Sequence, residues 1–145
     1  YTYSYEDENG YSYTHYAQPL AHPLGANFSE HLLALWYQPF PKIVINNTLL
    51  MANYGTDPTG ENYGGNVFLD YNTYSNEYGN FTGQGINNQL LMNDLVVSWQ
   101  FWHNASLDFR CIYRDLQVSA SGQNANELFF SVGVRLNEVL KQYLY

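Results

Sequence analysis

Three carboxylates and three guanidinium groups in the second half of the chain are the side chains best suited to acid–base chemistry or ion pairing. They belong to Asp94, Asp108, Asp115, Arg110, Arg114 and Arg135. Two carboxylates at a fixed separation could cleave a glycosidic bond, one as the acid and the other as the base or nucleophile. Nothing in the sequence fixes such a separation. Opposite charges on neighbouring strands would instead form ion pairs, and we predict this structural role for them.

Other chemical motifs are missing from the sequence. The four histidines, His15, His22, His31 and His103, lack the spacing of metal ligands, and the lone Cys111 excludes an intrachain disulfide and a cysteine-based zinc cluster. The acidic run Glu6–Glu8 could hold a divalent ion, but a solvated turn explains it better. The sequence has no nucleophile-elbow, zinc-protease, phosphate-loop or dinucleotide pattern. We therefore predict no catalytic residue, no metal site, no cofactor and no enzymatic activity.

Most of these charges lie on two strands, predicted within Leu90–Gln117, that form an antiparallel hairpin around His103–Ala105. Side chains alternate between the two faces of a strand, so residues of one parity share a face. One face is apolar and holds Leu91, Leu95, Val97, Trp99, Phe101, Leu107, Phe109, Cys111 and Tyr113. The opposite face holds Asp94, Ser98, Gln100, Asp108, Arg110 and Arg114. Each strand reaches roughly ten residues or more, close to the ~9–11 residues that cross a bilayer.

Two environments fit such a hairpin, a soluble sandwich with one face in the core and a membrane barrel with one face in lipid. The composition favours β structure in either case, because 18% of residues are aromatic and 11 are glycine. At 145 residues, a single domain over residues 1–145 is expected. The net charge of −8 argues against nucleic-acid binding. No apolar run reaches the ~18 residues that predict a transmembrane helix.

The remaining strands are predicted from the same alternation and from proline, glycine and asparagine stops. They are a tyrosine-lined hairpin over Tyr1–Tyr16 with a turn at Asn9-Gly10, and strands at Glu30–Gln38, Ile43–Tyr54, Val67–Tyr74 and Leu128–Asn137. Apolar residues from Leu136 to Leu144 recur at helical spacing. A short C-terminal helix and a continuation of the last strand to Tyr145 both remain open.

Short and long connections alternate along these strands. The links at Gln38–Lys42 and His103–Ala105 are short, whereas Gly55–Gln89 and Val118–Asn126 are longer and polar. Outer-membrane barrels have short periplasmic turns and long extracellular loops, with aromatic residues near the strand ends. The pattern predicts an all-β fold, an antiparallel transmembrane β-barrel with long extracellular loops. Only about six strands would span, fewer than the ~8 of a closed barrel, so a larger barrel or a partner must complete it.

In such a barrel the two faces of each strand meet different surroundings. We expect lipid contacts from Leu95, Val97, Leu107, Phe109, Tyr113, Leu128, Phe130 and Val132. The lumen would be lined by the polar side chains of Asp94, Asp108, Arg110, Arg114 and Arg135, arranged as a ladder of ion pairs.

The stretch from His22 to Phe28 is irregular yet apolar. Its proline and glycine prevent ladder pairing, while an apolar loop in water costs ~25 cal/mol per Å². We predict an inward loop that acts as a gate or constriction at the barrel mouth, formed by His22, Pro23, Leu24, Gly25, Asn27 and Phe28. Asn27 and Glu30 would satisfy some of its backbone groups. A mobile surface loop is the alternative.

Several motifs along the chain occur together in one family. They are Ser12–Glu30, the turn Tyr37-Gln-Pro-Phe-Pro41, Tyr54-Gly55, Gly64–Asn72, Gly79-Asn80, Gly83-Gln-Gly85 and Phe130–Arg135. The chain thereby resembles Bacteroidota outer-membrane proteins of the RemB gliding-motility type, which are related to the capsule-assembly (Wzi-like) barrels. The resemblance covers nearly the whole chain but only the C-terminal part of the family's longer sequence. The ending Val139–Tyr145 departs from it, because its spacing is more helical than alternating.

The resemblance implies location and partners better than mechanism. It implies a non-enzymatic protein of the bacterial outer membrane, with its long loops extracellular, that acts in gliding motility, secretion or surface polysaccharide handling. The implied partners are outer-membrane lipid, lipopolysaccharide, other outer-membrane or surface proteins, and a possible glycan. Two other functions remain open from the residues alone. One is a soluble β-sandwich module that binds glycans through Tyr, Trp and Asn side chains, and the other is a hydrolase with a carboxylate pair.

Overall fold

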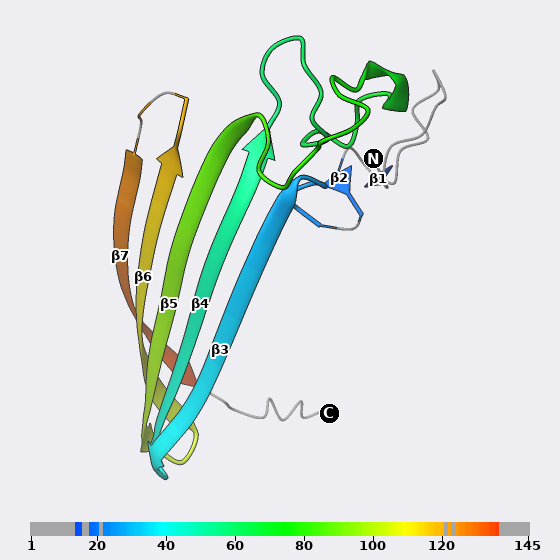
Figure 1. Cartoon of the computed structure of the whole chain (residues 1–145). Coiled ribbons are helices and arrows are strands. Elements are labelled where there is room, and N and C mark those ends of the chain that lie inside the picture. The colour runs from blue at the N-terminus through cyan, green and yellow to red at the C-terminus, as the bar shows by residue number, and fades with distance from the viewer. Residues whose placement is uncertain (1–13, 16–17, 21, 121, 123, 137–145) are drawn as a thin grey trace, which may run out of the picture. The chain divides into compact units, whose positions relative to one another are not determined.

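The computed structural model describes residues 14–15, 18–20, 22–120, 122 and 124–136. Its elements are β1 (Thr14–His15), β2 (Gln18–Pro19), β3 (Phe28–Phe40), β4 (Ile43–Thr56), the short 3₁₀ helix η1 (Tyr71–Thr73), β5 (Ile86–Trp102), β6 (Ala105–Val118) and β7 (Asn124–Leu136). Figure 1 labels the seven strands. The all-β fold predicted from the sequence is confirmed. The predicted strands within the described residues are present and extend further at one end or both, except the one at Val67–Tyr74.

Strands β3 to β7 form one antiparallel sheet in which each strand pairs with its neighbour in the sequence, in the order β3-β4-β5-β6-β7, and the sheet is not closed. Two tight hairpins build it, with turns at residues 41–42 and 103–104. A glutamine side chain closes each turn on a backbone carbonyl three residues ahead. Gln38 Nε2 donates to the Pro41 oxygen at 3.2 Å, and Gln100 Nε2 donates to the His103 oxygen at 2.9 Å.

The sheet carries almost no core of its own. Among the described residues, the buried hydrophobic side chains are those of Ala52, Val67 and Ala105. Large apolar side chains are exposed on β3 and β7, for example Leu33 at 64% and Phe130 at 72%. Besides the two-residue ladder of β1 and β2, the described residues form no second sheet. A soluble sandwich needs such a layer to bury an apolar face.

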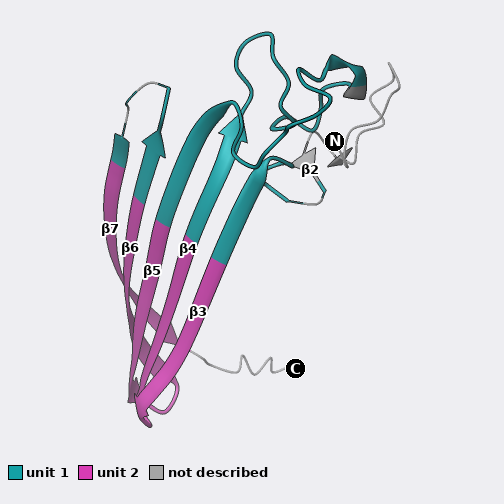
Figure 2. Ribbon diagram, in the orientation of Figure 1, with its two compact units in different colours: residues 1–31, 51–91, 115–125 teal, residues 32–50, 92–114, 126–145 magenta. Residues whose placement is uncertain are grey.

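Two compact units divide the chain, and Figure 2 colours them separately. Unit 1 comprises residues 1–31, 51–91 and 115–125, and unit 2 comprises residues 32–50, 92–114 and 126–145. Each of the strands β3 to β7 contributes residues to both. The long connection between β4 and β5 belongs to unit 1, and the two tight hairpin turns belong to unit 2.

The prediction of a short strand at Val67–Tyr74 is wrong. Turns and η1 occupy this stretch instead. The cause is local, because side chains of the Asn and Asp residues compete with a ladder for the backbone. Asn66 Oδ1 accepts a hydrogen bond from the Phe68 N–H at 3.0 Å, and Asp70 Oδ1 accepts one from the Asn72 N–H at 3.2 Å.

Two predicted elements lie largely or wholly outside the described residues. These are the tyrosine-lined hairpin of Tyr1–Tyr16, of which only residues 14–15 are described, and the C-terminal helix or strand beyond Leu136. The number of strands described in the large sheet is therefore five, against the six expected. Over the described ranges, no helix is long and apolar enough to cross a membrane.

Candidate functional site

The strongest ion pair of unit 2 joins neighbouring strands β5 and β6. Arg110 Nε lies 2.8 Å from Asp94 Oδ1, and Arg110 Nη2 lies 2.6 Å from Asp94 Oδ2. This parallel, two-point geometry is the strongest form of a carboxylate–guanidinium pair. The Asp94 side chain is 17% exposed, whereas half of the Arg110 side chain remains exposed. Because Asp94 and Arg110 contact each other, the even-numbered side chains of β5 and β6 lie on the same face of the sheet.

Two more ion pairs extend this charged face to β7. Arg135 Nη2 lies 3.1 Å from Asp108 Oδ1, and Arg114 Nη1 lies 3.6 Å from Glu127 Oε2. The structure thus brings all five residues predicted for a lumen into ion pairs on one face of unit 2, with Glu127 as an additional member. Asp115 does not join them. Its odd number places it on the other face of β6, where its carboxylate accepts from Gln117 Nε2 at 3.1 Å.

The charged face of unit 2 is hollowed into an open cleft of about 820 Å³. The polar side chains along it come from β4, β5, β6 and β7, and include Asn46, Ser98, Gln100, Ser106, Asp108 and Arg135. The two tight turns border it through Lys42, His103 and Asn104. Hydroxyl, amide and paired charged groups of this kind favour water and polar solutes over hydrocarbon.

The opposite face of the same strands is apolar. Cross-strand contacts identify its members as the odd-numbered residues of β4, β5 and β6 and the even-numbered residues of β7. All the side chains predicted to contact lipid lie on it, namely Leu95, Val97, Leu107, Phe109, Tyr113, Leu128, Phe130 and Val132. Nothing in the described part of the chain covers the β7 side chains of this face, since Phe130 is 72% exposed and Val132 is 66% exposed.

The predicted inward loop lies in unit 1, and Asn27 anchors it there. Asn27 is only 7% exposed. Its Oδ1 accepts from the Gly83 N–H at 2.8 Å, its Nδ2 donates to the Gln84 oxygen at 2.8 Å, and its backbone oxygen accepts from the Gly55 N–H at 2.9 Å. The loop is therefore packed against the long connection. The Asn27 side chain satisfies backbone groups of that connection rather than of the loop itself, and Glu30 contacts the His22 side chain, so this part of the prediction is wrong. Its place at a barrel mouth stays a prediction.

Close backbone contact explains the glycine of this loop. Gly25 has a φ of +82°, and a Cβ atom added to it would lie 2.3 Å from the Gly65 oxygen. Its N–H donates to the His22 oxygen at 3.1 Å, and the His22 ring stacks on Phe28 at 4.2 Å between centroids. Phe28, predicted in the loop, is the first residue of β3. His22 Nε2 lies 3.3 Å from Glu30 Oε2, which fixes the loop to that strand.

The connection between β4 and β5 is long but locally ordered by its acidic and amide side chains. The Asp57 carboxylate accepts from the backbone N–H groups of Tyr63, Gly65 and Asn66 at 2.8, 3.3 and 2.8 Å. Asn62 is 3% exposed and ties its turn to η1 by donating to Thr73 Oγ1 at 2.8 Å. The pKa of the Tyr63 phenol is raised, because its hydroxyl donates a hydrogen bond to Glu61.

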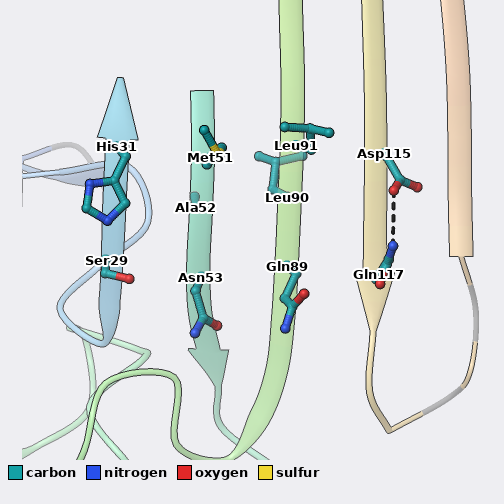
Figure 3. Close-up of a pocket in the computed structure, with 10 residues that line it drawn as sticks. All are labelled: Ser29, His31, Met51, Ala52, Asn53, Gln89, Leu90, Leu91, Asp115 and Gln117. Atoms are coloured by element: carbon teal, nitrogen blue, oxygen red, sulfur yellow. Dashed lines mark hydrogen bonds between the residues drawn. The ribbon is translucent and has the colours of Figure 1, made fainter. Parts of the chain in front are cut away.

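A pocket of about 460 Å³ opens in unit 1 over four neighbouring strands, and Figure 3 shows its lining. Its polar members are Ser29 and His31 from β3, Asn53 from β4, Gln89 from β5, and Asp115 and Gln117 from β6. Met51 and Leu91 supply apolar surface. Apart from the Asp115–Gln117 bond, no side-chain hydrogen bond is recorded between the residues drawn. Sequence reasoning missed this pocket because its residues come from four separate strands.

The described residues hold no group of three or more His, Cys, Asp or Glu side chains that could bind a metal ion. His22 and Glu30 form a pair, and His31 and Asp115 line the pocket without a recorded contact.

Comparisons with known proteins do not identify a family for this chain, because no protein-family model, curated protein or solved structure matches it.

Proposed function

We propose that this chain forms part of an antiparallel transmembrane β-barrel in a bacterial outer membrane, with the charged face of unit 2 lining the lumen. The observation that carries the proposal is the contrast between the two faces of one sheet. One face bears three ion pairs, and the other bears exposed apolar side chains that no described residue covers. In a barrel, lipid covers the apolar face and water fills the space beside the polar one.

Strand length supports the same proposal. The parts of β3 to β7 within unit 2 are residues 32–40, 43–50, 92–102, 105–114 and 126–136, between 8 and 11 residues each. A tilted strand needs ~9–11 residues to cross the hydrocarbon layer. Aromatic side chains gather toward the tight turns, with Trp99 and Phe101 centroids 6.2 Å apart and Trp102 next to His103. Tryptophan at such a level is typical of a membrane interface.

Strand direction sets how the barrel must close. In a five-stranded antiparallel sheet, the first and last strands, β3 and β7, run in the same direction. They cannot pair with each other in an antiparallel barrel, so an odd number of further strands must lie between them. With a minimum of ~8 strands, at least about three come from outside this sheet. Further strands of a larger barrel or of a partner supply them, since open edges are not stable in lipid.

The biological role rests on the resemblance to the RemB and Wzi-like outer-membrane proteins. On that basis the protein is non-enzymatic and acts in gliding motility, secretion or surface polysaccharide handling. Its partners are outer-membrane lipid, lipopolysaccharide and other surface proteins, and the connection of residues 57–85 lies outside the cell. The paired carboxylates support this, because Asp94 and Asp108 each bind an arginine and so are engaged as structural anions.

A soluble glycan-binding module is the second candidate, and the pocket of Figure 3 favours it. Hydroxyl, amide and carboxylate groups beside Met51 and Leu91 match a sugar, which presents hydroxyl groups at its edge and an apolar face. The absence of a covering layer on the described sheet counts against the soluble fold.

Fractionation of the native host separates the two candidates. The barrel protein sediments with the outer membrane, resists extraction by carbonate, and enters solution only with detergent. Its band on an electrophoresis gel shifts when the detergent sample is boiled, because a folded barrel survives the detergent until heated. Release into buffer without detergent would refute the barrel and leave the glycan-binding module, which binding to a panel of immobilised glycans then tests.

A further inference from the structure

Two asparagines interrupt the apolar face of unit 2 and bind each other. Asn47 Nδ2 on β4 donates to Asn93 Oδ1 on β5 at 3.1 Å, and Asn93 Nδ2 donates to Asn47 Oδ1 at 3.3 Å. Each amide uses one of its two N–H groups in this pair. The second N–H of each has no recorded acceptor among the described residues.

A second polar pair lies on the same face of β6 and β7. Asn126 Nδ2 donates to the Tyr113 hydroxyl at 3.2 Å. The backbone bond from the Ser119 N–H to the Asn87 oxygen, 3.0 Å long, aligns β6 with β5. Tyr113 precedes Ser119 by six residues, and Asn93 follows Asn87 by six residues. Because the two strands are antiparallel, Tyr113 and Asn93 lie opposite each other, and the two polar pairs lie at the same level. We call this set, formed by Asn47, Asn93, Tyr113 and Asn126, the polar row.

The polar row separates two kinds of surface along the strands. Between it and the tight turns, every side chain of this face on β4 to β7 is apolar: Ile43, Ile45, Leu95, Val97, Trp99, Phe101, Ala105, Leu107, Phe109, Cys111, Leu128, Phe130, Val132, Val134 and Leu136. Beyond it, residues of the same parity are polar at once on β6, at Asp115 and Gln117, and on β7, at Asn124. On β5 and β4, Leu91 and the pair Leu49 and Met51 come before the next polar side chains. The row is therefore the first polar level above the apolar band on all four strands.

We propose that the polar row lies at the headgroup layer of the outer leaflet, and that the apolar band below it spans the hydrocarbon. This inference rests on the proposed barrel. The unused amide N–H groups would lack acceptors in hydrocarbon, whereas headgroup phosphates, sugars and water supply them. Tyrosine prefers the same layer, because its ring is apolar and its hydroxyl is polar.

The height of the band agrees with this level. From Asn93 to Trp102, β5 advances nine residues, about 30 Å along the strand at ~3.3 Å per residue. At a tilt of about 45°, this distance corresponds to about 21 Å along the membrane normal, near the ~25 Å apolar band of outer-membrane barrels. The tight turns at the other end then lie on the periplasmic side, as short turns do.

Depth measurements with spin labels test the level of the row. The full-length protein carries Cys111→Ala, so that single cysteines introduced at Asn93, Asn126, Val97 or Gln89 can be labelled and placed in phospholipid vesicles. Collisions with oxygen report hydrocarbon and collisions with a nickel chelate report water. The label at Val97 should be deep, those at Asn93 and Asn126 at the headgroup boundary, and that at Gln89 in water.

The outcomes separate this inference from the barrel itself. If the labels at Asn93 and Val97 are equally deep, the row lies inside the hydrocarbon and the inference fails while the barrel stands. If the Val97 label collides only with the chelate, the barrel fails as well. If labels on the row are shielded from both reagents, a protein partner covers the row and the headgroup assignment is wrong.

A second variant tests the cause. Asn47→Leu together with Asn93→Leu removes the upper boundary, so a label at Leu91 should move from the headgroup layer toward the hydrocarbon. An unchanged depth at Leu91 would show that the amide pair does not set the level and would overturn that part of the proposal.

Discussion

Asp94 and Arg110 face each other across β5 and β6 with both carboxylate oxygens engaged, at 2.8 and 2.6 Å from two guanidinium nitrogens. The neighbouring pair of Arg114 and Glu127 has a single close contact of 3.6 Å. Geometry therefore ranks the two pairs, although each arginine side chain is about half exposed.

A double-mutant cycle with Asp94→Asn and Arg110→Met should give a small but measurable favourable coupling free energy, because the pair is bidentate but partly screened by water. The same cycle with Arg114→Met and Glu127→Gln should give a value near zero. Denaturant unfolding in detergent micelles measures both. Equal coupling in the two cycles would contradict the ranking.

The loop anchored by Asn27 should tolerate no side chain at position 25. Gly25→Ala places a methyl group 2.3 Å from the Gly65 oxygen, in addition to the strain of a positive φ. Gly60→Ala is the matched control, because Gly60 has a similar φ of +86° but a Cβ atom added there would meet no neighbouring atom within 4 Å. Gly25→Ala should speed amide exchange over residues 22–28 and 83–85, whereas Gly60→Ala should change only its own turn. Equal effects would mean that backbone strain, rather than packing, dominates.

The sheet could be predicted from the sequence because alternation along a strand is a local signal. Leu107, Phe109 and Tyr113 share a face by parity alone, and the cross-strand bonds agree. The sequence predicts the start of β5 too late, at Leu90 instead of Ile86, because Asn87 and Asn88 look like loop residues. In the sheet their amides are used, with Asn87 Nδ2 donating to Asn53 Oδ1 at 2.7 Å and Asn88 Nδ2 donating to the Ile86 oxygen at 2.9 Å.

The contacts of the loop could not be predicted in the same way. Asn27 binds Gly83 and Gln84, which lie 56 and 57 residues away in the sequence. No periodicity connects these positions, and the intervening connection is ordered by side chains such as Asp57 that bind backbone groups locally. The sequence therefore predicted that the loop would pack, but not that it would pack on this connection.

A new charge should destabilise the protein more on the apolar face of unit 2 than on the charged face. Phe109 lies on the apolar face and is 45% exposed, while Phe129 lies on the charged face beside Glu127 and Ser131 and is 68% exposed. Phe109→Arg should cost about 2–4 kcal/mol if the residue contacts the bilayer interior. Phe129→Arg should cost much less, because it would face water and acidic side chains. Unfolding by urea in phospholipid vesicles measures both, and a larger cost at Phe129 would reverse the assignment of the faces.

The connection of residues 57–85 should depend on Asp57 for its resistance to proteases. The Asp57 carboxylate accepts three backbone N–H bonds, from Tyr63, Gly65 and Asn66. Asp57→Ala leaves these donors without their acceptor, so the turn opens and cleavage over residues 58–66 should accelerate about tenfold or more, corresponding to ~1.4 kcal/mol or more of lost local stability. Glu77→Ala is the control, because Glu77 is an exposed acid of the same connection with no recorded bond.

Protease added to intact cells, with the cleavage sites mapped by mass spectrometry, tests both the role of Asp57 and the extracellular location of the connection. Faster cleavage of the Asp57 variant on intact cells supports an ordered extracellular segment. Cleavage seen only after the cells are lysed would contradict the extracellular location, and equal rates for the two variants would contradict the role of Asp57.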